Sequence, residues 1–372
     1  MIQRDISNII KNDFHKGKVL VLMGARQVGK TTLFQELSNS FEKKLLLNCD
    51  NYDSRMLLEN RTSTELEQLI KNYDVVLIDE AQKVKNIGLT LKMIADLKKP
   101  VQVLVTGSVS FVIANEINEP ATGRLFEYRL FPLSLHELTM HTSHIEEHRL
   151  LKQRMIYGMY PEVVTNPDDA KRILTNLANN YLYRDLLEYR GIKKPDVLQK
   201  LVQALALQIG SEVSYNELSR LVGIDKATVE SYVDLLEKCY VIFRLKAFSR
   251  NMRTEIKRGR KIYFYDNGIR NALISNFAPP ELRSDSGALW ENMMISERLK
   301  RNALHQSYAQ NYFWRTMQQS EIDLIEEMDG KLTAFEFKWG NKKSKMPQSF
   351  SENYPETHLE IVSPDNYIDF VS

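Results

Sequence analysis

The sequence predicts an α/β protein that begins with a parallel sheet flanked by helices and continues into a helical region and a smaller α/β domain. Three observations support this. Short apolar segments in 19–23, 75–78 and 101–105 are typical of strands buried on both faces. Between the first two lies an amphipathic helical pattern carrying Leu33, Phe34 and Leu37. After residue 195 the pattern changes to three helices followed by β-rich sequence.

The composition is that of an ordinary globular protein. The chain has 372 residues, of which 43% are hydrophobic, and this excludes disordered and fibrous classes. Its formal net charge of +2 means that any nucleic-acid surface must be a local basic patch. The two cysteines, Cys49 and Cys239, have no metal-binding or disulfide-framework spacing.

No segment of the sequence resembles a membrane span or a secretion signal. The start, MIQRDISNIIKNDF, has helical apolar spacing interrupted by charges, and no apolar run approaches the ~20 residues that a bilayer requires. We therefore expect a cytoplasmic protein without a membrane partner.

A phosphate-binding motif follows the first strand. Residues 24–31, GARQVGKT, fit G-x-x-x-x-G-K-[ST] between a strand and a helix. Gly24 and Gly29 permit a tight loop whose N–H groups face phosphates, Lys30 reaches the β- and γ-phosphates, and Thr31 offers a hydroxyl to Mg²⁺. The predicted cofactors are ATP and Mg²⁺. The predicted nucleotide-binding residues are Gly24, Ala25, Arg26, Gln27, Val28, Gly29, Lys30, Thr31 and Thr32.

Two acids end the second buried strand, in DVVLIDEAQ at 74–82. Parallel strands open their ligand crevice at their carboxyl ends. Asp79 is therefore expected to hold Mg²⁺ together with Thr31, and Glu80 to polarise the attacking water. The alternative for both acids is a helix cap.

The third strand, in VQVLVTGS at 101–108, ends in hydroxyl residues. Thr106 or Ser108 could contact the γ-phosphate or the attacking water. A turn motif explains these residues almost as well.

Together these motifs resemble AAA-type P-loop ATPases of bacteria and archaea over about the first 165 residues. The resemblance implies nucleotide at the carboxyl ends of the strands. It also implies an arginine that senses or stabilises the γ-phosphate, matched here by Arg124 in ATGRLF. Arg26, Arg129 and Arg184 compete for that role, and a structural salt bridge is the alternative for Arg124.

The expected domains are an ATPase domain at 1–165, a helical connector or lid at 166–195, a winged helix at 196–285 and a last domain at 286–372. The third resembles a winged helix-turn-helix, with a turn at Gly223, a second helix at 225–239 and a wing at 241–265.

Charge separates the two parts of the expected winged helix. The second helix carries two lysines against four acids, which is unfavourable for entering a DNA groove. The wing from Arg244 to Lys261 carries eight cations and one acid, enough to contact a DNA backbone without reading sequence. The alternatives are a solvated basic hairpin and one docked on another subunit.

The last domain carries acids spaced as in a metal site. Asp323 and Glu336 fall on two expected strands joined by a turn at 329–330, with Lys338 on the same face as Glu336 and Glu291 on the preceding helix. Glu291, Asp323 and Glu336 could hold a divalent ion while Lys338 stabilises a phosphate. This series resembles the restriction-endonuclease-like, or PD-(D/E)xK, fold, and the whole order resembles AAA-type ATPases whose C-terminal region has no assigned function. An active nuclease and a module that does not cleave both remain open.

The sequence thus predicts an ATPase that couples its nucleotide state to the C-terminal region, acting on DNA. The alternatives are a nucleotide-dependent switch or scaffold, and an ATP-gated nuclease. Assembly into a homo-oligomer is possible.

Overall fold

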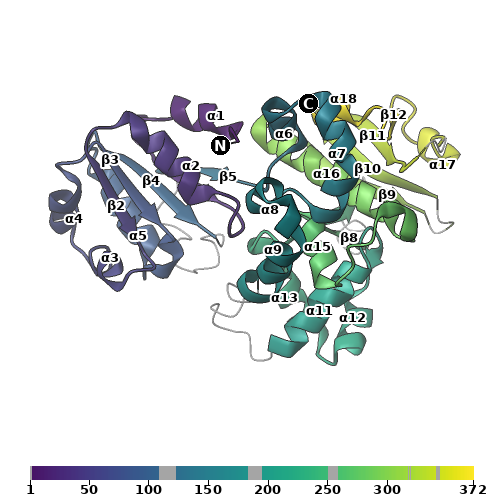
Figure 1. Ribbon diagram of the computed structural model, residues 1–372, viewed down its shortest axis with the longest axis horizontal. Coiled ribbons are helices and arrows are strands. Elements are labelled where there is room, and N and C mark those ends of the chain that lie inside the picture. The colour runs from purple at the N-terminus through teal and green to yellow at the C-terminus, as the bar shows by residue number, and fades with distance from the viewer. Residues whose placement is uncertain are drawn as a thin grey trace. The chain divides into compact units, whose positions relative to one another are not determined.

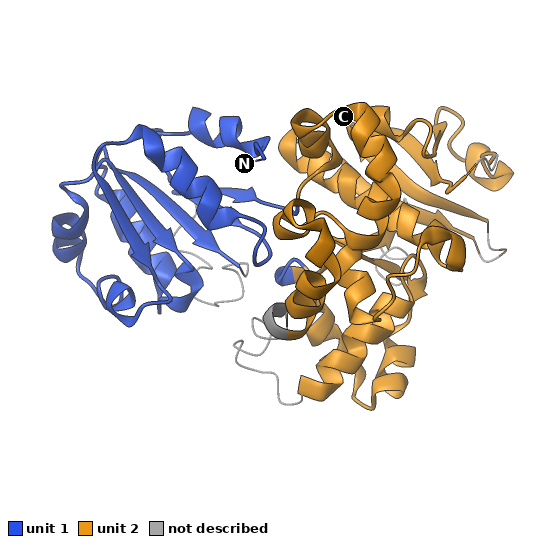
Figure 2. Cartoon of the chain, viewed as in Figure 1, with its two compact units in different colours: residues 1–132, 238–240 blue, residues 133–237, 241–372 orange. Residues whose placement is uncertain are grey.

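The computed structural model describes residues 2–108, 123–182, 195–249, 259–316, 318, 320–340 and 344–372. The chain forms two compact units (Figure 2). Unit 1 comprises residues 1–132 and 238–240, and unit 2 comprises residues 133–237 and 241–372. Arg184 and the centre of the basic hairpin, residues 250–258, lie outside the described residues.

Unit 1 contains a five-stranded sheet in the order β2-β3-β4-β1-β5, and every pairing in it is parallel. The strands are β1 (Val19–Met23), β2 (Lys44–Asn48), β3 (Val75–Asp79), β4 (Gln102–Gly107) and β5 (Leu125–Arg129). All residues of β1, β3 and β4 are buried, as their continuous apolar sequences predict. The expected parallel sheet is confirmed.

Helices flank this sheet (Figure 1). They are α1 (Ile6–Asn12), α2 (Lys30–Leu37), α3 (Tyr52–Met56), α4 (Ser63–Ile70) and α5 (Ile87–Asp96). A capping box at Thr62 and Glu65 begins α4, since each side chain bonds to the other residue's backbone N–H. Leu66 and Leu91 bury their side chains in the same apolar cluster as Val76 and Ile78 of β3. This cluster fixes the strands whose ends form the site described below.

Unit 2 is a seven-stranded mixed sheet with helices. Its sheet order is β12-β11-β10-β9-β7-β8-β6. The strands are β6 (Glu212–Val213), β7 (Ile242–Ala247), β8 (Arg260–Phe264), β9 (Gln310–Arg315), β10 (Glu321–Met328), β11 (Lys331–Phe337) and β12 (His358–Val362). The helices are α6 (Leu135–His141), α7 (His144–Tyr157), α8 (Pro161–Thr165), α9 (Ala170–Asn176), α11 (Pro195–Leu207), α12 (Tyr215–Val222), α13 (Lys226–Lys238), α15 (Asn267–Leu273), α16 (Ser286–Leu304), α17 (Gln348–Ser351) and α18 (Tyr367–Val371).

The helix-turn-helix pattern is present in α12 and α13. Gly223 joins them with a φ of +73°, a conformation that favours glycine. The side chain of Asp225 accepts a hydrogen bond from the Thr228 N–H at 2.9 Å at the start of α13.

The hairpin that follows α13 does not stand apart as a wing. β7 and β8 pair antiparallel, but β7 also pairs in parallel with β9, through Lys246 with Tyr312 and Ala247 with Phe313. Strands on both sides of the expected domain boundary, between residues 285 and 286, therefore belong to one continuous sheet. Sequence periodicity carries no information about which edge of a hairpin accepts a further strand, so this joining was not foreseen.

A turn at Asp329 and Gly330 joins β10 to β11, which pair antiparallel as expected. Both turn residues have positive φ, of 51° and 78°, and this is the conformation that a two-residue hairpin turn requires. The predicted hairpin is confirmed.

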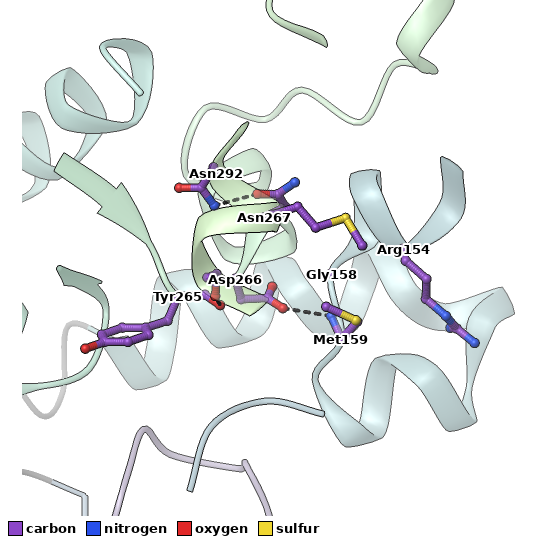
Figure 3. Close-up of a pocket in the computed structure, with 9 residues that line it drawn as sticks. Arg154, Gly158, Met159, Tyr265, Asp266, Asn267 and Asn292 are labelled. Atoms are coloured by element: carbon purple, nitrogen blue, oxygen red, sulfur yellow. Dashed lines mark hydrogen bonds between the residues drawn. The ribbon is translucent and has the colours of Figure 1, made fainter. Parts of the chain in front are cut away.

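Residues 133–165, expected in the ATPase domain, lie in unit 2. Buried polar contacts hold them there. The Asp266 carboxylate accepts from the Met159 N–H at 2.7 Å, and Asn292 bonds to Asn267 at 2.7 Å beside it (Figure 3). At Gly158, φ is +68° and a Cβ would lie 2.1 Å from Asp266 Oδ1, so any larger residue would break this contact.

Among the described helices, none is both long and apolar enough to cross a membrane.

Candidate functional site

The loop between β1 and α2 is built as a phosphate cradle. Gly29 precedes α2 with a φ of +97°, a conformation that side chains rarely adopt. A Cβ on Gly24 would lie 2.1 Å from the Leu130 carbonyl oxygen. Both glycines are therefore required by geometry, and together they place the N-terminus of α2 at the carboxyl end of β1, where backbone N–H groups attract an anion.

The Lys30 ammonium lies inside this loop. It donates hydrogen bonds to the carbonyl oxygens of Gly24, at 3.0 Å, and Ala25, at 2.8 Å, and the residue is buried. Both of these acceptors are neutral carbonyl groups, and a charged phosphate oxygen is a stronger acceptor than either. The lysine is thus positioned to exchange carbonyl contacts for phosphate contacts.

Oxygen atoms that suit Mg²⁺ converge beside it. The Thr31 hydroxyl donates to Asp79, with Oγ1 2.9 Å from Oδ1 and 3.0 Å from Oδ2. The Thr106 hydroxyl also donates to Asp79 and accepts from the Glu80 N–H at 3.1 Å. A hydroxyl and a carboxylate at the mouth of a phosphate loop are the hard ligands that Mg²⁺ uses, so the residues fit this ion. Thr106 lies deeper and orients Asp79 and Glu80.

Glu80 begins the segment after β3 in a left-handed conformation, with φ of 53°. Its carboxylate accepts a hydrogen bond from the Gln82 side-chain amide at 2.6 Å. The same Gln82 nitrogen lies 2.9 Å from the Ser108 hydroxyl. Gln82 thus links the acid after β3 to the hydroxyl after β4, a role that sequence reasoning missed although DEAQ contains the residue.

The Gln82 side-chain amide oxygen is a buried acceptor without a partner among the described residues. Buried amide oxygens are usually satisfied. The atom is therefore available to accept a hydrogen bond from a bound molecule or water.

Arg4 is a second residue that the sequence analysis missed. Its guanidinium donates to the Val28 carbonyl at 2.7 Å and to the Phe131 carbonyl at 2.7 Å, and the residue is buried. It therefore ties the phosphate loop to the chain just beyond β5. A lone arginine near the N-terminus gives no sequence signal for this role.

The structure bears on the assignment of Arg124 as the arginine that senses the γ-phosphate. Arg124 precedes β5, whose first residue pairs with Val19 at the start of β1, and it forms a salt bridge with Asp96. It lies about 15 Å of strand away from the loop end of the sheet. Arg124 therefore lies away from the phosphate loop of its own chain, and its role toward the γ-phosphate stays a prediction. Arg129, which pairs with Met23 at the other end of β5, lies at the loop edge.

The predicted acids of unit 2 are brought together. Asp323 in β10 and Glu336 in β11 are both buried, and Lys338 lies 2.5 Å from Glu336 and 3.7 Å from Asp323. The Phe337 N–H donates to Asp323 at 2.9 Å. Burial raises the pKa of both carboxyls, with the charge of Asp323 adding to the rise at Glu336.

Lys261 and Tyr263 of β8 also enter this cluster, and neither was predicted there. Lys261 lies 3.1 Å from Glu291 and contacts Glu321, and the Tyr263 hydroxyl donates to Glu291 at 2.5 Å. Burial raises the pKa of Glu291 to about 7, and Lys261 offsets part of the rise. Lys261 was counted from the sequence as a solvent-facing cation of the wing. In the fold, only 2% of its side chain is exposed.

Comparison with known proteins bears first on the part of the chain that carries the phosphate loop. Residues 16–139 match a family described as an AAA domain. This match, together with the fold of unit 1, supports a P-loop ATPase. Two families described as domains of unknown function match residues 148–280 and 286–366.

Curated relatives match this chain over most of its length. An uncharacterized protein of Mycobacterium tuberculosis is 25% identical over 344 residues, which cover 90% of this chain and 74% of the relative. An uncharacterized protein of Haemophilus influenzae is 22% identical over 280 residues, 69% of each chain. A solved Walker-type ATPase of Pyrococcus abyssi matches with a TM-score of 0.52 and 15% identity, over 74% of this chain and 96% of that one. This likeness shows the fold.

Proposed function

We propose that the protein binds ATP with Mg²⁺ at the 24–31 loop, hydrolyses it, and uses the nucleotide state to control unit 2. The observation that carries this proposal is the convergence of Lys30, Thr31 and Asp79 at the N-terminus of α2. A lysine, a hydroxyl and a carboxylate in this arrangement supply what nucleoside triphosphate binding requires.

Each side chain has a distinct part in the proposed reaction. Lys30 and the N–H groups at the start of α2 bind phosphate oxygens. Thr31 and Asp79 would hold Mg²⁺, which neutralises charge on the β- and γ-phosphates when bound. Glu80 orients and polarises the attacking water, with Gln82 and Ser108 fixing the position of its carboxylate.

The decisive experiment measures ATP binding and phosphate release by the purified full chain. Lys30→Ala should weaken ATP binding by roughly 10- to 100-fold, whereas Glu80→Gln should keep binding and slow turnover. Hydrolysis that survives both changes at the level of the unmodified protein would contradict the proposal.

DNA is the second part of the proposal, as the substrate on which unit 2 acts. The sequence of the β7–β8 hairpin supports it, but the described cations limit where DNA could bind. Arg244 pairs with Asp234 and Glu237, Arg260 with Glu230, and Lys261 is buried. The contact would therefore depend on exposed Lys246 and on the cations at 250, 253, 257 and 258.

Salt dependence tests this contact. Binding of a fluorescent duplex should weaken about 10²- to 10³-fold between 50 and 200 mM salt if about five phosphates are contacted. Replacing Arg250, Arg253, Lys257 and Arg258 by glutamate should remove it, while the same change at four exposed lysines of unit 1 should not. Absence of binding at low salt would favour a nucleotide-dependent switch that acts on a protein partner.

A further inference from the structure

We infer that Lys261 takes the place of a metal ion in the acidic cluster of unit 2, so that the cluster holds an internal ammonium and binds no divalent cation. The acidic cluster is defined as Glu291, Glu321, Asp323 and Glu336. This inference concerns unit 2 alone and does not depend on ATP hydrolysis in unit 1.

The Lys261 ammonium pairs with two of the four acids. It lies 3.1 Å from Glu291 Oε1 and contacts Glu321, and its charge also acts on Asp323. The ring of Phe313 lies 5.6 Å from it. Only 2% of its side chain is exposed, so the ammonium is shielded from solvent and depends on these carboxylates to offset its charge. An ammonium has no lone pair and therefore cannot ligate a metal.

Every carboxylate of the cluster already has donors from the protein. Glu291 accepts from Tyr263 and Lys261, and Glu321 pairs with Lys261 and lies 3.9 Å from Arg315. Asp323 accepts from the Phe337 N–H, and Glu336 accepts from Lys338 and from Ser344 at 3.3 Å.

The cluster also lacks the spatial grouping of a metal site. Within the described part of the chain, no three His, Cys, Asp or Glu residues are placed so that they could hold one metal ion between them. A divalent ion that binds Glu291 would have to displace the Lys261 ammonium from that carboxylate. It would leave that charge buried without its partners, which is strongly unfavourable.

Lys261 and the four acids lie in different regions of the sequence, so their ion pairs connect those regions. Lys261 lies in the region 148–280 that matches one family, and all four acids lie in the region 286–366 that matches another. The ion pairs therefore fasten the two regions together across the sheet, next to the β7–β9 pairing that joins them. The cluster stabilises unit 2 as one body.

Manganese binding measured by electron paramagnetic resonance tests the inference. The full chain would carry Lys30→Ala and Asp79→Asn, which remove the metal site of the ATPase domain, and no nucleotide would be added. At about 1 mM Mn²⁺, the weak end of protein sites for divalent ions, this protein should bind none. Adding Lys261→Met, which keeps most of the apolar side chain but lacks the ammonium, should create one site per chain. Adding Asp323→Asn should then abolish that site.

Two outcomes would overturn the inference. One is Mn²⁺ binding by the protein that retains Lys261, provided that Asp323→Asn abolishes it. The other is a folded Lys261→Met protein that gains no site. If Lys261→Met does not fold, Mn²⁺ titration of the protein that retains Lys261, with and without Asp323→Asn, is sufficient to test the inference. A DNA cleavage assay with Mn²⁺ gives a second measurement, since cleavage by the unmodified chain that Lys338→Ala abolishes would equally contradict the inference.

Discussion

The hydroxyl of Thr31 lies within 3.0 Å of both carboxylate oxygens of Asp79. The two residues are 48 positions apart in the sequence and are joined by the parallel sheet, whose strand ends place the start of α2 beside the end of β3. This contact is the core of the ATPase site, and the first predictions concern the residues around it.

Replacing Lys30 by alanine should weaken ATP binding by roughly 10- to 100-fold, since a charge-assisted hydrogen bond contributes about 1.5–3 kcal/mol. The anisotropy of a fluorescent ATP analogue measures the dissociation constant. Lys43→Ala, at an exposed lysine of the same unit, is the control and should change nothing. Equal affinity of the Lys30 and Lys43 variants would show that the loop does not bind phosphate through this ammonium.

Replacing Glu80 by glutamine should lower the rate of hydrolysis by about 10²- to 10⁴-fold, because a side chain that acts on the attacking water contributes that much. ATP affinity should stay within about threefold, since the amide keeps the shape of the side chain. Phosphate release at saturating ATP is the measurement. Glu36→Gln, at an exposed position of α2, should hydrolyse ATP at the unmodified rate.

Replacing Arg4 by methionine should reduce ATP affinity about tenfold. The loss of the hydrogen bonds to Val28 and Phe131 frees the phosphate loop from the chain after β5. Arg4→Lys restores one donor and should recover part of the affinity, whereas Lys11→Met, exposed on α1, should have no effect. If Arg4→Met lowered the melting temperature while leaving affinity intact, Arg4 would be a structural residue only.

Asp285 should make unit 2 sensitive to acid. Burial raises its pKa, but hydrogen bonds from Arg283 and Arg270 more than offset this and lower the pKa to about 2. A carboxyl with a lowered pKa in the folded state stabilises the fold above its ordinary value of 3.8 and loses that contribution as the pH falls toward 2. Asp285→Asn should therefore destabilise the protein by about 1 to 2 kcal/mol at neutral pH, after allowance for solvent screening.

Thermal melts between pH 7 and pH 2.5 check this pH dependence. The gap between the melting temperatures of Asp285→Asn and the unmodified protein should narrow below pH 4. Asp365→Asn, at an exposed aspartate of unit 2, should show no gap at any pH. A gap for Asp285→Asn that stays constant down to pH 2.5 would exclude the titration of this carboxyl as its cause.

The residues of the candidate ATPase site could be predicted to lie together because their signals are local. The chemistry is recognisable within a few residues, from a glycine-rich turn between a strand and a helix and from acids at the end of a buried apolar strand. The residues that the sequence analysis missed, Arg4 and Gln82, act through backbone carbonyls and a hydroxyl far along the chain. No local pattern records such contacts. The position of Arg124 was not predictable for the same reason, since its distance from the loop depends on which end of β5 it occupies.

The sequence by itself determined the parallel sheet of unit 1, the phosphate loop, the pair of hydroxyl and acid ligands, and the β10–β11 hairpin. These features follow from hydrophobic period, glycine conformation and turn chemistry, which act between neighbours in the chain. Only the tertiary structure decided that the basic hairpin continues into the sheet of the last domain and that Lys261 points into the acidic cluster there. Strand order and the burial of a charge depend on partners more than 25 residues away, such as Glu291, 30 positions from Lys261.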